Sequence, residues 1–540
     1  MDKIVSLTKQ LVEKGIRMNI SELKRKIKED YGSNPLEKCD KDEAKNMLRL
    51  VKIYHDLKEE KDARVIDDIT WEDIEMDEVF FRVNHTRSYA GEQILYHMLH
   101  MIKNDKPGVD EEADFFDRDE KTRVETEMKL RSLGKRYMKY YLPETIFNLD
   151  GLVMGGTFMY PILLLLLIGS FVISAFKPGF LAVTVAIAVV NLMVYMVVKM
   201  KYDSTLISLC SVREIVDFGD YVMKSDKLWE VYKNKEIEES MSALQKATKF
   251  LIYYKYTKNM IQSGDFVAII LEYIFGMTMI DAICCASAIK RLRSHKDEII
   301  RLYEMIGNID AAISVASFRR SLDSCKPELT SDGKISADGL YHPLLENPVK
   351  NDFHMKRNSF FTGANATGKS TFMKAIAINV ILGETIYTCT ADKMCFPNMY
   401  VMTSMALRDD VLNGESYYVR EIRYLKRMLE QVESGVKTLI VIDEILKGTN
   451  TKERVAASRA VLEYLADTSA VVITATHDIE LVEQMDELYD AFYFECIVND
   501  GEVKFTYEIR EGVNKITNAI ELMKGMGFPQ QIIENAEKRR

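Results

Sequence analysis

The sequence predicts an α/β domain of the P-loop class over residues 326–540, preceded by mainly α-helical segments that a transmembrane helical hairpin interrupts. Three observations indicate this architecture. A glycine-rich loop lies between an apolar strand and a helix. Two later apolar strands end in an acidic pair and in a histidine. Two neighbouring runs of apolar residues carry no charge.

Size and composition agree with a folded protein of several domains. The chain has 540 residues, of which 47% are hydrophobic and 29% charged. Its formal net charge of −10 disfavours indiscriminate coating of nucleic acid, although a local basic face stays compatible with it. The eight cysteines form no CxxC pair, so we expect reduced thiols in a cytosolic environment.

The N-terminal half is expected to be helical. Residues 1–66 are charged and predicted to form a helical segment whose role stays open. Residues 67–150 are predicted to form a helical core domain, and residues 200–325 long helices of a core and lever. The basic stretch 246–258, with interleaved tyrosines, is either a phosphate-contacting face or a solvated amphipathic face.

Residues 157–198 are predicted to form a transmembrane helical hairpin. The runs 157–176 and 180–198 contain no charged residue, and each is long enough to cross about 30 Å of hydrocarbon. Only Lys177, Pro178 and Gly179 separate them. A hairpin buried in a soluble core is the alternative, which the lack of any polar face disfavours.

Basic residues flank both ends of this hairpin. They are Lys135, Arg136, Lys139, Lys199 and Lys201. Because positive charge favours the cytoplasmic side, we expect a protein of the cell membrane with both soluble portions in the cytoplasm. A third apolar stretch, residues 266–289, contains Glu272 and Asp281, so we expect one long core helix that continues to Arg301, with a third membrane crossing as the alternative.

The glycine-rich loop predicts a nucleotide-phosphate site. It comprises Gly363, Ala364, Asn365, Ala366, Thr367, Gly368, Lys369 and Ser370, and matches GxxxxGK[ST]. Residues 359–361 suit a buried strand before it, and residues 371–382 have helical apolar spacing after it. The loop's N–H groups and helix start would face phosphates, with Thr371 beside them. Lys369 would supply a charge and Ser370 a Mg²⁺ ligand.

Two further strand ends complete the predicted site. The apolar run 438–442 ends in Asp443, a candidate Mg²⁺ ligand, and Glu444, a candidate base for the attacking water. The run 470–475 precedes His477, which we expect to sense the γ-phosphate. Because the three strands are expected to be parallel neighbours, these side chains are predicted to surround one ATP and its Mg²⁺.

These motifs together resemble the ATPase domain of the MutS family of mismatch-repair proteins. The resemblance rests on TGANATGKST, VIDEILKGTNT and TATHD. Looser similarity covers 339–345, 84–91 and 309–319. It implies an ABC-type ATPase domain with ATP and Mg²⁺, coupled to a helical core and lever.

The resemblance also implies roles for single residues. Asn365 would approach the γ-phosphate, and Glu444 would be the catalytic base, beside Lys369 and His477. Ser416 matches the family's signature serine, which reaches the partner subunit's nucleotide; a helix N-cap is its plainer role. The family further implies a homodimer and DNA as partner.

Two departures from the family pattern bear on function. The mismatch-reading domain of the family uses a Phe-x-Glu wedge, and no Phe-x-Glu occurs in this chain. A transmembrane hairpin is foreign to the soluble repair enzymes. We therefore expect a membrane-anchored MutS-like protein without the mismatch-reading domain.

The leading hypothesis is a membrane-tethered dimeric ATPase that clamps a partner, with DNA implied by the family. One alternative is an ABC-type half-transporter, although the spans contain little to line a polar path and no Leu-Ser-Gly-Gly-Gln-like signature occurs. Another is an ATP-gated membrane scaffold that binds no DNA.

Overall fold

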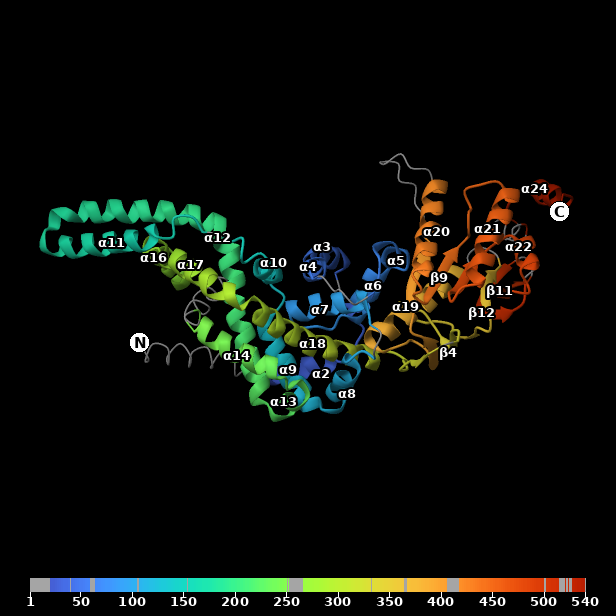
Figure 1. Cartoon of the computed structure of the whole chain (residues 1–540), viewed down its shortest axis with the longest axis horizontal. Helices are drawn as coiled ribbons and strands as arrows, with labels where there is room; N and C mark the ends of the chain where they lie inside the picture. The colour runs from blue at the N-terminus through green and yellow to red at the C-terminus, as the bar shows by residue number, and fades with distance from the viewer. Residues whose placement is uncertain are drawn as a thin grey trace.

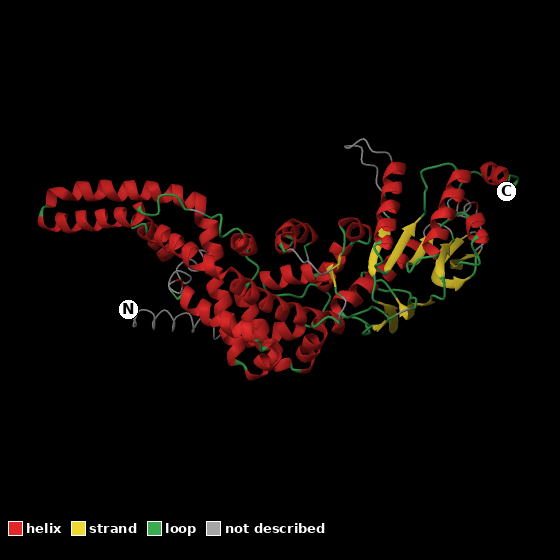
Figure 2. Ribbon diagram, in the orientation of Figure 1, coloured by secondary structure: helices red, strands yellow, loops and turns green. Residues whose placement is uncertain are grey.

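The computed structural model describes residues 20–38, 40–58, 64–103, 106–152, 154–249, 251, 266–331, 333–363, 367–405, 417–499, 502–513, 520, 523 and 527–539. The molecule is elongated, with an α/β end, a helical middle and a pair of apolar helices at the opposite end (Figure 1). Figure 2 shows that nearly all strands gather at the α/β end.

Two sheets form the α/β end. Within the described residues, the larger sheet has the order β12-β11-β6-β10-β9-β8, and every neighbouring pair except β11–β12 is parallel. Its strands are β6 (Asn358–Thr362), β8 (Tyr400–Ser404), β9 (Thr438–Asp443), β10 (Val471–Ala475), β11 (Tyr489–Asn499) and β12 (Glu502–Glu511). The central strands are buried and apolar, as parallel strands covered on both faces require.

The smaller sheet has the order β3-β7-β4-β5 in the described residues. Its strands are β3 (Glu328–Thr330), β4 (Ser336–Leu340), β5 (Asn351–His354) and β7 (Lys393–Pro397). The helices of this end are α19 (Lys369–Ile386), α20 (Tyr417–Glu433), α21 (Thr451–Ala466), α22 (Ile479–Gln484) and α24 (Gln530–Glu537). Helix α19 is buried along most of its length, which places the helix after the glycine loop in the core.

Helices form the middle of the molecule. In the first part these are α2 (Ile20–Asp30), α3 (Lys41–Val51), α4 (Ile53–Leu57), α5 (Asp68–Asp73), α6 (Met76–Val83), α7 (Tyr89–His100), α8 (Val109–Arg118), α9 (Glu120–Leu133) and α10 (Leu142–Phe147). Two short strands, β1 (Arg64–Val65) and β2 (Met101–Ile102), pair antiparallel. After the apolar pair come α13 (Asp226–Tyr232), α14 (Lys235–Thr248), α16 (Phe266–Met277), α17 (Ile280–Leu292) and α18 (Lys296–Arg320).

Two segments that resembled a known family meet in the centre of this bundle. The carboxylate of Asp310, on α18, is fully buried and accepts hydrogen bonds from the Ser88 hydroxyl at 2.6 Å and the Arg87 amide at 3.0 Å. Ser314, one turn later, accepts from the His85 amide at 2.7 Å. The segments 84–91 and 309–319 therefore form one buried joint between α7 and α18.

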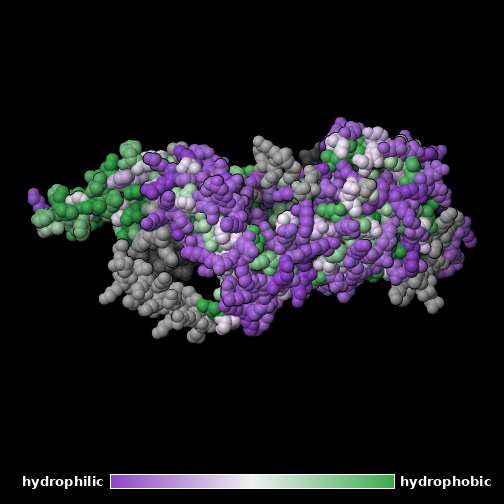
Figure 3. Space-filling view, turned by 60° about the horizontal axis from the view of Figure 1, so that its bottom comes forward, coloured by the Kyte–Doolittle hydropathy of each residue, from purple (hydrophilic) through white to green (hydrophobic). Residues whose placement is uncertain are grey.

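The apolar helices are α11 (Met159–Phe176) and α12 (Leu181–Lys224), which run side by side (Figure 1). Among the described residues, these helices contain two stretches long and apolar enough to cross a membrane, Met159–Phe176 and Pro178–Tyr202. Only 11% and 17% of the two stretches is buried. Figure 3 shows the resulting apolar surface projecting from a mostly hydrophilic body.

The prediction of one continuous helix from residue 266 to 301 is wrong. The backbone breaks between α16 and α17, where Met279 adopts a left-handed φ of 56°. The break lets α16 lie along α12, and the Asn191 amide of α12 donates to the Met277 carbonyl at 2.9 Å. Ile270 and Tyr273 of α16 are exposed and extend the apolar surface.

Lys139, which we counted among the cations flanking the hairpin, lies inside the protein. Its ammonium is buried and contacts the Glu214 carboxylate at 2.5 Å and the Leu133 carbonyl at 2.7 Å. Lys135 is paired with Glu92 at 3.0 Å. These two charges serve the helical core, and the positive flank of the apolar pair is smaller than the sequence suggested.

Candidate nucleotide site

The glycine loop joins β6 to α19, as the residue pattern predicts. Strand β6 ends at Thr362, and helix α19 begins at Lys369. Gly363 and Gly368 have φ values of 125° and 101°, a region that favours glycine because a Cβ is strained there. Ala364, Asn365 and Ala366 lie outside the described residues, so the predicted contact of Asn365 stays a prediction.

Ser370 and Asp443 meet at the edge of the sheet. The Ser370 hydroxyl, in the first turn of α19, donates to the Asp443 carboxylate at 2.6 Å. Asp443 ends β9, which is separated from β6 by β10 alone in the described sheet. A hydroxyl and a carboxylate are oxygen donors that suit Mg²⁺, which usually takes one or two protein ligands plus phosphate oxygens.

No cluster of three or more His, Cys, Asp or Glu side chains in the described part of the chain is placed to hold a metal ion. A Mg²⁺ site that relies on nucleotide oxygens does not need such a cluster. The pair Ser370 and Asp443 therefore fits the predicted role of both residues as Mg²⁺ ligands.

Lys369 lies inside the loop. Its ammonium donates to the Gly363 carbonyl at 2.6 Å, across the mouth of the loop. Burial lowers the pKa of Lys369, while Asp443 and Glu444 oppose the shift. A buried lysine between a glycine-bent loop and two carboxylates is placed to meet an anionic ligand.

Glu444 and His477 are in direct contact. The His477 ring nitrogen Nε2 lies 3.2 Å from Glu444 Oε1, and the Lys447 ammonium lies 2.8 Å from Oε2. The hydrogen bond from His477, then Lys447, lowers the pKa of Glu444 to about 2. Glu444 also has a left-handed φ of 63°, a strained conformation of the kind found at functional sites.

Replacing Lys447 with alanine is expected to move the acid limb of the hydrolysis rate. Without this cation the pKa of Glu444 rises, so the glutamate is protonated, and inactive as a base, at a higher pH. We expect the acid limb of kcat/KM to shift upward by about one pH unit. Lys452→Ala, at an exposed position of α21, is the matched control. Coincident pH–rate profiles down to the most acid pH at which both proteins stay folded would contradict the proposed effect of Lys447 on the pKa of Glu444.

The turn after Glu444 is held by α20. The Glu421 carboxylate accepts from the Lys447 amide at 3.0 Å and from the Gly448 amide at 3.4 Å. Burial raises the pKa of Glu421. This contact joins α20 to the start of the turn 448–451. Ser416 itself lies outside the described residues, so its contact with a partner subunit's nucleotide stays a prediction.

A cavity of about 360 Å³ adjoins Gly368. Its walls include Thr371 of α19, His342, and two aromatic residues of the β11–β12 pair, Phe494 and Tyr507. Burial lowers the pKa of His342 to about 4, so this wall is uncharged at neutral pH. A largely apolar cavity beside a phosphate loop suits a nucleotide base. The sequence motifs did not identify Phe494 or Tyr507, which lie well over a hundred residues from the loop.

Tyr507→Ala is expected to raise KM for ATP about tenfold with little change in kcat. The tyrosine faces Gly368, where a Cβ would lie 3.2 Å from its ring, so its loss removes aromatic surface from the base cavity. Stacking on an aromatic side chain contributes roughly 1–3 kcal/mol per base. Steady-state kinetics measures the effect. Tyr507→Phe should preserve KM. Tyr464→Ala, on distant α21, controls for the loss of a tyrosine. An unchanged KM in Tyr507→Ala would exclude this cavity as the base site.

Comparison with known proteins adds independent information. Residues 359–540 match the family model for MutS domain V. The chain is 30% identical over 266 residues to the DNA mismatch repair protein MutS of Pseudothermotoga lettingae, covering 47% of this chain and 32% of that protein. It is 31% identical over 260 residues to the MutS of Fusobacterium nucleatum, covering 46% and 29%.

A further relative is the DNA mismatch repair protein MutS 2 of Halobacterium salinarum, 29% identical over 243 residues, or 43% of this chain and 28% of the relative. The chain thus spans about a third of the length of the curated relatives it matches. The predicted resemblance is confirmed.

Proposed function

We propose that this chain, which carries a MutS-family domain V in residues 359–540, is a membrane-tethered ATPase. It works as a homodimer and couples ATP binding and hydrolysis to clamping of DNA. The observation that supports the ATPase is a pair of contacts that join the end of β9 to the start of α19 and to the residues that follow β10. Ser370 contacts Asp443, and Glu444 contacts His477. ATP would be held by the loop, with Mg²⁺ beside Ser370 and Asp443.

Helix α19, which starts at the glycine loop, ends against the helical middle of the molecule. Arg319, in the last turn of α18, donates to the carbonyls of Ile386 and Tyr387 at 3.1 Å each. These carbonyls lie at the carboxyl end of α19, where a cation is favoured by the helix dipole. The Arg319 guanidinium also donates to the Thr388 hydroxyl at 2.8 Å. A displacement of α19 at the nucleotide would therefore act directly on α18.

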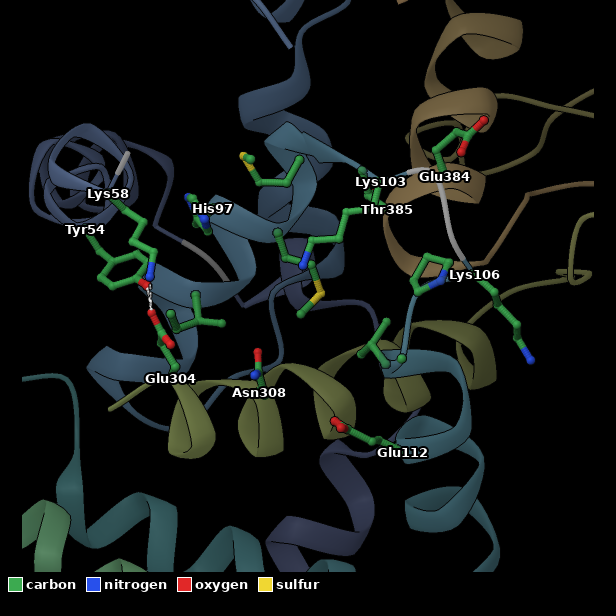
Figure 4. A pocket seen from close by; sticks show the side chains of 16 residues that line it. Tyr54, Lys58, His97, Lys103, Lys106, Glu112, Glu304, Asn308, Glu384 and Thr385 are labelled. Atoms are coloured by element: carbon green, nitrogen blue, oxygen red, sulfur yellow. Dashed lines mark hydrogen bonds and ion pairs between the residues drawn. The ribbon is translucent and has the colours of Figure 1, made fainter. Parts of the chain in front are cut away.

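A cavity lies at this junction (Figure 4). It has about 360 Å³ and is lined by α4, α7, α18 and the end of α19. Lys58 contacts Glu304 across one side, and Glu384 of α19 faces the other, where it accepts from the Met399 amide at 2.9 Å. Burial raises the pKa of Glu384 to about 7. The cavity therefore lies where the end of α19 meets the helical middle.

The membrane tether is supported by the exposed apolar surface of α11 and α12. Asn191, a polar residue of the second apolar stretch, is buried and donates to the carbonyls of Leu163 and Met277. It therefore joins the helices and does not line a polar path, which disfavours a half-transporter. With the remaining cations near Lys199, we propose the cell membrane as location and the cytoplasm for both soluble portions.

The proposal that the chain binds DNA rests on the family resemblance, and the salt dependence of binding tests it. The full-length chain in detergent should bind duplex, branched or mismatched DNA with an affinity that falls steeply with salt, because phosphate contacts release counterions. Fluorescence anisotropy from 50 to 300 mM salt, with ADP or a non-hydrolysable ATP analogue, measures this. Absence of binding at the lowest salt would remove DNA and favour an ATP-gated scaffold.

Glu444→Gln separates a motor from a scaffold. The substitution should preserve ATP binding and stop hydrolysis, because the amide no longer accepts a proton. A clamp that needs turnover would then remain closed on DNA, whereas a binding switch would open and close as before with added nucleotide.

A further inference from the structure

A cavity of about 450 Å³ lies at the base of the apolar helix pair, between the start of α11 and helix α17. The volume is within the range of ligand pockets, roughly 300–1,000 Å³. On the α11 side its walls are formed by Leu152, Met154, Thr157 and Pro161. On the α17 side they include Ile283 and Ala286, then Ser287, Lys290 and Arg293.

Two cations lie together on the α17 side. Lys290 and Arg293 are exposed and one turn apart. In the described part of the chain neither is paired with a carboxylate. The Arg293 guanidinium donates to the Leu152 carbonyl at 3.1 Å, which holds it against the α11 side of the cavity. The nearby Asp150 is itself bound by Lys296 at 2.8 Å. The cavity thus has a net positive rim.

The rest of the cavity is apolar and adjoins the surface proposed to contact lipid. Pro161 lies in the first turn of α11, next to exposed Met159 and Ile162. Thr157 and Ser287 add two hydroxyls to the lining. The cavity therefore combines an apolar surface, hydroxyls and positive charge. Phospholipids combine the same three features as acyl chain, glycerol and phosphate.

We propose that this cavity binds the headgroup of an anionic phospholipid. The inference depends on the proposed membrane tether, which would bring the base of α11 to the level of the headgroups. Lys290 and Arg293 would contact the phosphate, Thr157 and Ser287 the glycerol region, and Pro161 the first part of an acyl chain. A free phosphate would leave the apolar wall exposed to water, which is why a lipid is the favoured source. The bound lipid would brace α17 against α11, and α17 leads directly into α18.

The test uses the full-length chain in dodecylmaltoside micelles, titrated with dioleoylphosphatidylglycerol or dioleoylphosphatidylcholine and followed by native mass spectrometry. We expect retention of the anionic lipid at lower concentration than of the zwitterionic one. In Lys290→Ala/Arg293→Ala, binding of the anionic lipid should weaken by about fivefold for each cation removed. Binding of phosphatidylcholine should stay the same.

The matched control is Lys199→Ala/Lys201→Ala, which removes two cations at the same end of the apolar pair but outside the cavity. A loss below twofold there supports a specific site. Equal losses in the two double variants, or no preference for the anionic lipid, would overturn the proposal. Displacement of the lipid by sn-glycerol 3-phosphate at equal concentration would also overturn it, because the acyl wall would then contribute nothing.

Failure of the tether is measured separately. Flotation of the full chain with vesicles of pure phosphatidylcholine reports membrane insertion without any anionic lipid. Flotation together with unchanged lipid preference in the cavity variant would reject the headgroup site alone. Absence of flotation would reject the tether, and with it the headgroup site.

Discussion

Lys369→Ala is expected to abolish ATP turnover, with a fall in kcat/KM of at least about a thousandfold, because it removes the cation nearest the proposed phosphates. In the structure this ammonium lies between the loop carbonyl of Gly363 and the carboxylates of Asp443 and Glu444. Its loss would leave two anions facing an anionic substrate. Phosphate release measured over a range of ATP concentrations below and above KM gives the effect.

Two controls make this result interpretable. Lys393→Ala removes an exposed lysine from β7 of the smaller sheet and should leave hydrolysis unchanged. Thermal unfolding of Lys369→Ala, without nucleotide, should occur at no lower temperature than that of the parent, because burial lowers the pKa of Lys369, which means that its buried charge opposes folding. Normal hydrolysis by a folded Lys369→Ala protein would refute the assignment of the loop.

Two arginine substitutions in the middle of α11 are expected to prevent membrane insertion. Leu165 and Ile168 are 66% and 51% exposed, and lie far from both ends of the helix. In lipid each arginine costs about 2.5–3.5 kcal/mol at the centre of a span, whereas in water exposed arginines cost almost nothing. Leu165→Arg/Ile168→Arg should therefore move the protein from the membrane fraction to the soluble fraction or to aggregates.

The matched control places the same charges at the tip of the helix pair. Phe176 and Leu181 are 83% and 57% exposed and flank the turn at Lys177, where an arginine reaches the headgroups. Phe176→Arg/Leu181→Arg should stay in the membrane fraction when detergent-free lysates are floated in a density gradient, which separates membranes from aggregates. If the central variant also stays there, or if the parent chain is soluble, the tether is wrong.

Local sequence patterns predicted the strands of the site to within about one residue, since apolar runs that end in polar residues mark buried parallel strands. The predicted run 438–442 became β9, which extends to Asp443, and 470–475 became β10. Their order in the sheet, with β10 between β6 and β9, brings the predicted residues together. That order depends on long-range packing and cannot be read from any single motif.

Other features escaped the sequence for identifiable reasons. The residue with the left-handed φ at the break is Met279, not a glycine, and apolar residues continue on both sides of it. Tyr507 belongs to an antiparallel pair whose approach to Gly368 is set by tertiary packing. The burial of Lys139 depends on Glu214, 75 residues away, so a count of basic residues near a span treats it as a surface charge.

Helix α18 contacts two functionally different parts of the molecule, one at each end: the base of the proposed membrane tether and the helix that starts at the nucleotide loop. Its first residue, Lys296, donates to the Phe147 carbonyl near the base of the apolar pair, and Arg319 holds the end of α19. The helix has 25 residues and is about 37 Å long. Thermodynamic linkage is reciprocal. If nucleotide binding displaces α18 and thereby α11 and α12, then bilayer thickness or lateral tension acting on α11 and α12 must in turn change the affinity for ATP. The protein would then report the mechanical state of its membrane through the nucleotide it holds.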